Sequence, residues 1–188
     1  MQTQGRIICF VGPSGVGKTS YATRLMKRYG FTLPNVVTTR KRRSDDDHRY
    51  QYVTESTFAE MKRSGLFLEW DEYANHSYGT LARDVKEAVS LEHSHGIVLD
   101  LTPNGCRQIV DAAPTAIVIA LLPDDPSWLF ERLRNRNSQS LEEILQRMNI
   151  LKDYLIQTES LNCKKVYVSF YPDSWDKTFE VIERVIFG

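Results

Sequence analysis

The chain has 188 residues, a length that suits one domain of ordinary size with a substantial core. Lysines and arginines number 24, and so do aspartates and glutamates, so no overall field favours a nucleic acid or an anionic membrane. The cysteine count is three, with no metal-ligand spacing, which favours a reduced intracellular setting. No signal peptide and no run of about 18 apolar residues is visible. We therefore predict a cytoplasmic protein that binds neither nucleic acid nor membrane.

Residues 12–19 read Gly-Pro-Ser-Gly-Val-Gly-Lys-Thr, a complete G-x-x-x-x-G-K-[ST] phosphate loop. An apolar run at 7–11 before it suits a buried parallel strand, and residues 20–29 after it have helical spacing. This arrangement points backbone N–H groups at phosphates, with Lys18 on the β- and γ-phosphates and Thr19 on Mg²⁺. The sequence therefore predicts nucleoside triphosphate binding. The predicted phosphate-binding residues are Gly12, Ser14, Gly15, Val16, Gly17, Lys18, Thr19 and Ser20.

Strands and helices alternate along most of the chain. Further buried-strand patterns occupy residues 97–101, 115–122 and 165–169. Helical patterns occupy residues 82–93, 103–112, 126–135, 140–158 and 173–186. This alternation predicts an α/β fold of the P-loop NTPase class, a three-layer sandwich in which helices cover both faces of a parallel sheet.

The rhythm changes between residues 31 and 80. Short strands are predicted at 35–39, 50–53 and 67–70, around a helix at 55–63. The stretch is rich in aromatic and apolar side chains, so we interpret it as an inserted subdomain rather than a linker. Residues 135–140 are polar, lie between arginine-rich helix ends, and are interpreted as a mobile flap.

Asp100 ends an apolar strand, at the sheet edge where the phosphate loop is expected. It is a candidate Mg²⁺ ligand opposite Thr19, and the alternative is a cap for the helix that follows Pro103. Arg40 and Arg43 belong to a basic run in the inserted subdomain. Their planar guanidinium groups suit a second phosphate, and the alternative is a solvated face.

Glu69 lies between apolar neighbours, where a carboxylate is costly unless it is paired or exposed. In a pocket it can accept the N1–H and N2–H₂ donors of guanine, and the alternative is an exposed strand face. Arg132, Arg136 and Arg147 flank the predicted flap. They are candidates to close over a transferring phosphoryl group, and the alternative is that they are surface arginines.

From about residue 6 to residue 186 the chain resembles the guanylate kinase family. The landmarks are the phosphate loop, Thr-Thr-Arg at 38–40 with Arg43, Phe-Leu-Glu-Trp at 67–70 and Tyr-Gly-Thr at 78–80. The resemblance implies that Arg40, Arg43, Tyr50 and Tyr78 hold the monophosphate of the acceptor. It further implies that Glu69 reads guanine N1 and N2, that the Thr80 hydroxyl donates to O6, and that position 102 belongs to the same GMP-binding set.

The family's architecture implies a core at 1–32, 81–125 and 159–188, an NMP-binding insertion at 33–80 and a lid at 126–158. The implied reaction is phosphorylation of GMP or dGMP by ATP with Mg²⁺, in a monomer or homodimer. Thr19 and Asp100 would hold the metal. The implied catalytic residues are Lys18, Arg132, Arg136 and Arg147.

Four departures from the family pattern bear on the acceptor. The family usually has Asp-x-Asp where this chain has Asp100-Leu101-Thr102, and its second aspartate helps to read guanine. Losing a charged hydrogen-bond partner costs about 1.5–3 kcal/mol, or roughly tenfold to a hundredfold in discrimination. The other changes are Val36 for serine, Arg49 for aspartate and Ser169-Phe170 for Asn-Asp. Two alternatives therefore remain: a same-fold kinase with another nucleoside monophosphate or a phosphorylated sugar as acceptor, and a non-catalytic module that binds a protein partner.

Overall fold

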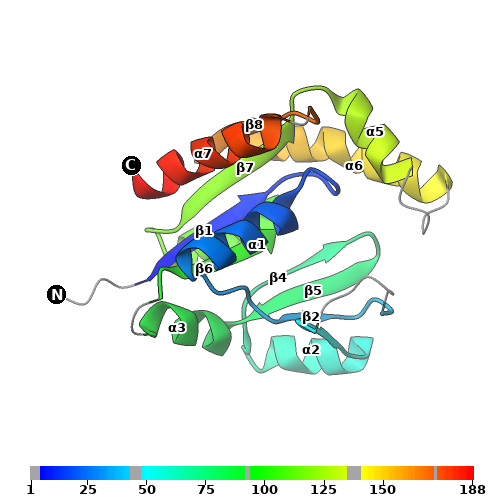
Figure 1. Cartoon of the computed structure of the whole chain (residues 1–188). Coiled ribbons are helices and arrows are strands. Elements are labelled where there is room, and N and C mark those ends of the chain that lie inside the picture. The colour runs from blue at the N-terminus through cyan, green and yellow to red at the C-terminus, as the bar shows by residue number, and fades with distance from the viewer. Residues whose placement is uncertain (1–4, 43–47, 92–93, 135–140, 172) are drawn as a thin grey trace.

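The computed structural model describes residues 5–42, 48–91, 94–134, 141–171 and 173–188 (Figure 1). Within these residues, a main sheet contains the strands β1 (Arg6–Val11), β6 (Gly96–Leu101), β7 (Ile117–Pro123) and β8 (Lys164–Val168). The helices around it are α1 (Lys18–Tyr29), α3 (Ala82–Ser90), α4 (Pro103–Ala112), α5 (Pro126–Arg134), α6 (Leu141–Glu159) and α7 (Ser174–Phe187). In the described part of the chain, no helix has both the length and the apolar character needed to cross a bilayer.

The strands of the main sheet are parallel, in the order β6-β1-β7-β8. Successive residues of β1 face opposite sides of the sheet. Phe10 packs in a core with residues of α1 and α7, whereas Cys9 packs in a second core with residues of α3 and α4. Both faces of the sheet are covered, so its strands are apolar on both sides. The predicted three-layer α/β sandwich is confirmed.

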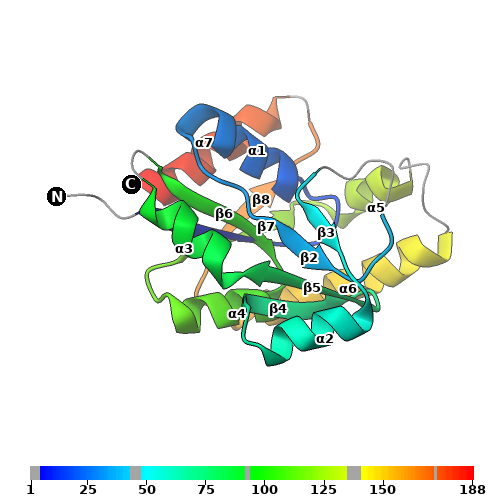
Figure 2. The same ribbon diagram turned by 90° about the horizontal axis from the view of Figure 1, so that it is seen from below.

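A second sheet lies beside the main one and includes both parallel and antiparallel pairs (Figure 2). Its strand order is β3-β2-β5-β4. The strands are β2 (Val36–Thr38), β3 (Tyr50–Tyr52), β4 (Phe67–Tyr73) and β5 (His76–Leu81), and α2 (Glu55–Arg63) packs on them. Phe58 of α2 is buried with Val37 and Leu81, so the second sheet has a small core of its own.

The second sheet contains more strand than the sequence patterns predict. β5 is not among the predicted strands, and β4 continues to Tyr73 instead of ending at residue 70. The reason is pairing: β5 is hydrogen-bonded to β2 on one side and to β4 on the other. The helix predicted at 82–93 is shorter in the structure, because α3 ends at Ser90 and Leu91 is its extended C-cap. The predicted flap at 135–140 lies outside the described residues.

Two junctions join the second sheet to the main one. On the way in, Thr32 pairs with β6, because its N–H donates to Gly96 O at 2.8 Å and its carbonyl accepts from Val98 N at 2.9 Å. On the way out, Leu81 is both the last residue of β5 and the N-cap of α3. In addition, α4 packs against β4, so the start of α4 lies next to the second sheet.

Candidate functional site

The phosphate loop connects the end of β1 to the start of α1. Its first position requires glycine, because a Cβ at Gly12 would lie 2.1 Å from the carbonyl oxygen of Leu121 on β7. Gly17 has a φ of 108°, a left-handed conformation that glycine adopts without strain, and it is the N-cap of α1. The loop therefore packs closely on the main sheet, with the N-terminus of a helix at its end, which is an arrangement that binds anions.

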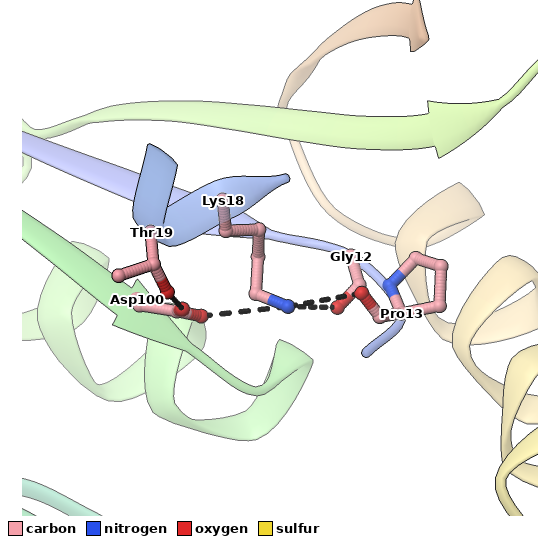
Figure 3. A network of polar contacts seen from close by, with 5 residues as sticks. All are labelled: Gly12, Pro13, Lys18, Thr19 and Asp100. Carbon is pink, nitrogen blue, oxygen red and sulfur yellow. Dashed lines mark hydrogen bonds and ion pairs between the residues drawn. The ribbon is translucent and has the colours of Figure 1, made fainter. Parts of the chain in front are cut away.

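Lys18, Thr19 and Asp100 lie together in front of this loop (Figure 3). The Lys18 ammonium donates to Gly12 O at 2.7 Å and to Pro13 O at 3.1 Å, and lies 3.5 Å from the Asp100 carboxylate. The Thr19 hydroxyl donates to the same carboxylate at 3.5 Å. Asp100 pairs in register with Phe10 near the end of β1, which brings it to the loop.

The interpretation of Asp100 as a helix cap is wrong. Thr102 is the N-cap of α4, and its hydroxyl accepts a hydrogen bond from Gly105 N at 3.0 Å. The Asp100 carboxylate instead faces Lys18 and Thr19.

The hydroxyl of Thr19 and the carboxylate of Asp100 have the chemistry of a magnesium site. Both are hard oxygen donors, and Mg²⁺ is usually held by one or two carboxylates together with substrate phosphates and water. Across the described residues, no group of three or more His, Cys, Asp and Glu side chains could hold a metal ion. These two residues therefore fit a Mg²⁺ that arrives with a phosphate chain.

A cavity of about 280 Å³ is lined jointly by the phosphate loop and the second sheet. Gly15 and Lys18 line it from the loop, and Arg40 and Tyr50 line it from the second sheet. Arg40 is only 5% exposed, and its guanidinium lies 4.7 Å from the centre of the Tyr50 ring and 5.7 Å from that of Tyr52. This stacking fixes a buried positive charge in the same cavity as the loop.

Two carboxyl residues and two hydroxyl residues line the same cavity, and we call them together the acidic cluster: Glu69, Asp71, Thr80 and Thr102. Glu69 is 5% exposed and accepts a 2.6 Å hydrogen bond from the Thr80 hydroxyl. Burial raises the pKa of the Glu69 carboxyl from 4.5 to about 7; the Thr80 hydrogen bond opposes this rise and the Asp71 charge adds to it. Glu69 is therefore a buried carboxyl that titrates close to neutral pH.

Tyr50 faces both signs of charge. Burial is the main reason that its pKa is raised, and the Asp100 carboxylate contributes in the same direction, whereas Arg40 opposes the rise. The Tyr50 hydroxyl is therefore neutral around pH 7 and keeps its proton to donate.

Most of the predicted site residues line this cavity. They are Gly12, Ser14, Gly15, Gly17, Lys18, Thr19, Ser20, Arg40, Tyr50, Glu69, Tyr78, Thr80, Asp100, Thr102 and Arg132. Val16 is not among them: its side chain is fully buried in the core, and its N–H donates to Pro13 O at 3.4 Å. Arg43 and Arg136 lie outside the described residues, and Arg147 lies on a part of α6 whose side chains are not described.

Several lining residues were missed by sequence reasoning. The main ones are Asp71, Tyr73 and Tyr154; Arg49, which the sequence indicated only as a departure from the family pattern, also lines the cavity. The signal for two of them is strand alternation, because positions 69, 71 and 73 of one strand share a face. Because the predicted strand ends at residue 70, this shared face was not recognised from the sequence. Tyr154 reaches the cavity from α6, and no local pattern in the sequence indicates that approach.

The glycine loop between β1 and α1, in front of a helix-covered parallel sheet, defines a nucleotide-binding protein of the phosphate-loop class. A family model described as guanylate kinase matches residues 4–187. This chain belongs to the guanylate kinase family.

Curated relatives and a solved structure agree with this assignment. The guanylate kinase of Trichodesmium erythraeum (strain IMS101) is 34% identical over 191 residues, covering 100% of this chain and 98% of that protein. The guanylate kinase of Nostoc sp. (strain PCC 7120 / SAG 25.82 / UTEX 2576) is 31% identical, with coverages of 98% and 90%. A crystal structure of guanylate kinase from Anaplasma phagocytophilum has the same fold, with a TM-score of 0.67 at 18% identity, and the match covers 99% of this chain and 86% of that one.

Proposed function

We propose that this protein transfers the γ-phosphoryl group of ATP to GMP or dGMP, giving ADP and GDP or dGDP, with Mg²⁺. The observation that carries the proposal is the shared cavity: Arg40 and Glu69 from the second sheet line the same space as Lys18 from the phosphate loop. Two anionic substrates can therefore meet there, one on each side. Membership of the guanylate kinase family supports the choice of acceptor.

On the donor side, loop N–H groups and Lys18 would hold the β- and γ-phosphates. The Lys18 ammonium donates to two loop carbonyls, so it is held beside the loop where the phosphates would lie. Thr19 and Asp100 would hold Mg²⁺, which neutralises charge on the phosphate chain when it is bound. Serine and glycine residues of the loop would complete the cradle.

On the acceptor side, Arg40, Tyr50 and Tyr78 would grip the monophosphate, with Arg43 as a predicted fourth partner. Glu69 would accept from guanine N1–H and N2–H₂. The Thr80 hydroxyl donates to Glu69 at 2.6 Å, and it can rotate to donate to guanine O6 instead.

Transfer would then need no covalent enzyme intermediate. An acceptor phosphate oxygen forms a bond to the γ-phosphorus while the bond to the β–γ bridging oxygen breaks, and ADP leaves with that electron pair. Arg40 offsets repulsion between the two anions, and Lys18 offsets charge on the transferring group. Arg132 lines the cavity and would act with Arg136 and Arg147 as lid arginines.

The proposed moving parts are the insertion at 33–80 and the lid at 126–158, around a core of 1–32, 81–125 and 159–188. Closure of both would exclude water and suppress hydrolysis of ATP. A cytoplasmic monomer or homodimer remains our prediction for the setting.

An acceptor panel tests the proposal. GMP, dGMP, AMP, CMP, UMP and a sugar phosphate are each incubated with ATP–Mg²⁺, and ADP formation is followed. We expect kcat/KM for GMP to exceed that for the non-guanine acceptors by about a hundredfold or more, the scale of two charged hydrogen bonds. A better acceptor elsewhere in the panel would replace GMP. Binding of ATP without turnover of any acceptor would favour a non-catalytic module.

Lys18→Ala tests the donor side. We expect kcat to fall by about a hundredfold or more, as when one preorganised donor to a transition state is removed. The matched control is Lys27→Ala, an exposed lysine on the same helix, which should leave kcat unchanged. Equal melting temperatures for both variants would show that the fold is kept. Near-normal turnover by Lys18→Ala would refute the donor-site assignment.

A further inference from the structure

A second carboxylate accompanies Glu69 in the acidic cluster. Asp71 lies two residues further along β4, so its side chain leaves the same face of the strand. Both residues line the cavity. Any base that reaches Glu69 therefore also meets the charge of Asp71.

The start of α4 fixes the Asp71 carboxylate. One oxygen accepts from the Thr102 hydroxyl, and the other accepts from the Asn104 amide at 3.2 Å. The Thr102 hydroxyl itself accepts from Gly105 N at 3.0 Å. A hydroxyl has only one proton, and in this structure the Thr102 proton is given to Asp71, so Thr102 presents no proton to a base while that hydrogen bond is kept. Thr102 therefore acts on the cavity through Asp71.

The backbone between the two carboxylates is fixed as well. Trp70 N donates to Gln108 Oε1 at 3.2 Å, and Gln108 Nε2 donates to Trp70 O at 2.8 Å. This pair of hydrogen bonds ties β4 to α4 midway between Glu69 and Asp71. Gly105 completes the arrangement, since a Cβ there would lie 2.7 Å from the Glu69 carboxylate.

We infer that Asp71 is a second base-reading residue, which accepts from the exocyclic amino group of guanine, and that Thr102 is the positioning residue that aims it. This inference rests on the proposed function. It assigns to β4 the carboxylate that is absent at position 102.

The chemistry of the base edge supports this pairing. Guanine presents three N–H bonds on one edge, one on N1 and two on N2. Glu69 has two oxygens and can take the N1 proton and one N2 proton. Each Asp71 oxygen accepts one hydrogen bond within the protein and keeps a further lone pair for the remaining N2 proton. Hypoxanthine has N1–H but no amino group, so it offers Asp71 no hydrogen-bond donor.

The test compares GMP with inosine monophosphate as acceptors, because only GMP has the amino group. The protein is assayed with ATP–Mg²⁺ as wild type and as Asp71→Ala. We expect the GMP/IMP ratio of kcat/KM to fall by about tenfold to a hundredfold in Asp71→Ala, chiefly through GMP. The matched control is Glu72→Ala, an exposed carboxylate at the next position of β4, which should keep the wild-type ratio.

A purely structural role for Asp71 gives a different result. Both acceptors would then lose kcat/KM in parallel, and the unchanged ratio would overturn the inference. The double variant Asp71→Ala, Thr102→Asp moves the carboxylate to the neighbouring helix start, and it should restore at least part of the ratio. If wild type uses neither GMP nor IMP, the proposed function fails. If wild type uses GMP and Asp71→Ala keeps the wild-type GMP/IMP ratio, only this inference fails.

Thr102 variants provide an independent arm, which also decides the matter if Asp71→Ala does not fold. Thr102→Val keeps the shape but removes the hydroxyl, and should lower the GMP/IMP ratio about threefold or more by freeing Asp71 to turn away. Thr102→Ser keeps the hydroxyl and should retain the ratio. A Thr102→Val protein with the wild-type ratio would contradict the positioning role.

Discussion

Glu69 occupies a position where being ionised is costly to the fold. Burial raises the pKa of this carboxyl from 4.5 to about 7 in the folded protein, which corresponds to about 3 kcal/mol between the two protonation states. Between these two values the folded chain binds more protons than the unfolded chain, so the free energy of unfolding falls as pH rises. A hydrogen-bonding role for the carboxylate is a reason to keep such a residue.

Glu69→Gln removes the charge and keeps the shape. Since the Gln carbonyl can still accept from Thr80, we expect the free energy of unfolding at pH 8 to rise by about 2 kcal/mol, with little gain at pH 4.5. Urea unfolding at the two pH values measures this difference. Glu60→Gln, an exposed position on α2, should show no such pH dependence. Equal gains at both pH values for Glu69→Gln would contradict the assignment.

The same titration should appear in substrate binding. Below about pH 7 the Glu69 carboxyl is protonated and loses an acceptor for guanine, so the KM for GMP should rise as pH falls from 8 to 6. The ratio of this KM to that of Glu69→Gln cancels titration of GMP itself. We expect the ratio to change about tenfold across this range, while the KM for ATP shows no matching change. A KM ratio that does not change with pH would show that Glu69 does not bind the base.

At the scale of elements, contact between β4 and α4 supports the acidic cluster. Among the described residues, no strand pairs with the outer edge of β4, and the side-chain amide of Gln108 is hydrogen-bonded to both backbone groups of Trp70 there. A strand edge held in this way keeps its register without a further strand.

Gln108→Met should loosen this edge. Two half-buried backbone groups lose their partners, so we expect a loss of about 1–2 kcal/mol in the free energy of unfolding. Because Glu69 and Asp71 flank Trp70, the KM for GMP should rise while the KM for ATP stays constant. The comparison variant is Asp111→Ala, an exposed position on α4. An unchanged KM for GMP would mean that the clamp serves stability alone.

The main sheet is predictable because its strands are buried on both faces and are therefore apolar throughout. β5 is not predictable in this way, because the sequence Tyr78-Gly79-Thr80 is typical of a turn. A Cβ at Gly79 would lie 2.7 Å from the Phe67 ring, so glycine is there for close packing inside a sheet. Polar residues after Trp70 hid the end of β4 in the same way. The phosphate loop could be predicted because all its parts are consecutive, whereas Asp71 depends on pairing between distant segments.

For the whole molecule, a formal net charge of zero hides a local separation of charge. Lys18, Arg40 and Arg132 line the cavity together with Glu69 and Asp71. A nucleotide has a matching polarity, because its phosphates are anionic and a guanine edge carries N–H donors. We therefore expect recognition of a nucleotide to come from short-range complementarity in the cavity rather than from long-range steering.

Ligand-linked melting tests this two-sided cavity. ADP and GMP should each raise the melting temperature, because a ligand at a hundred times its Kd adds about 2.7 kcal/mol to the free energy of unfolding. In Arg40→Ala the effect of GMP should be lost and that of ADP retained, each measured against the ligand-free variant. Arg42→Ala, an exposed neighbour, should behave like wild type. Loss of both effects in Arg40→Ala would indicate a general disturbance of the fold.

Both ends of the second sheet are attached near one strand of the main sheet. The chain enters through Thr32, which is hydrogen-bonded to β6, and it leaves through Leu81 directly into α3, which packs on β6. A rigid unit that is attached along one side moves by rotating about that side as a hinge. We expect any opening of the second sheet to be a rotation about this line, in which parts close to the line move least and the contact between β4 and α4 limits the movement. We therefore expect substrate access to depend on the angle of this rotation rather than on unfolding of a linker.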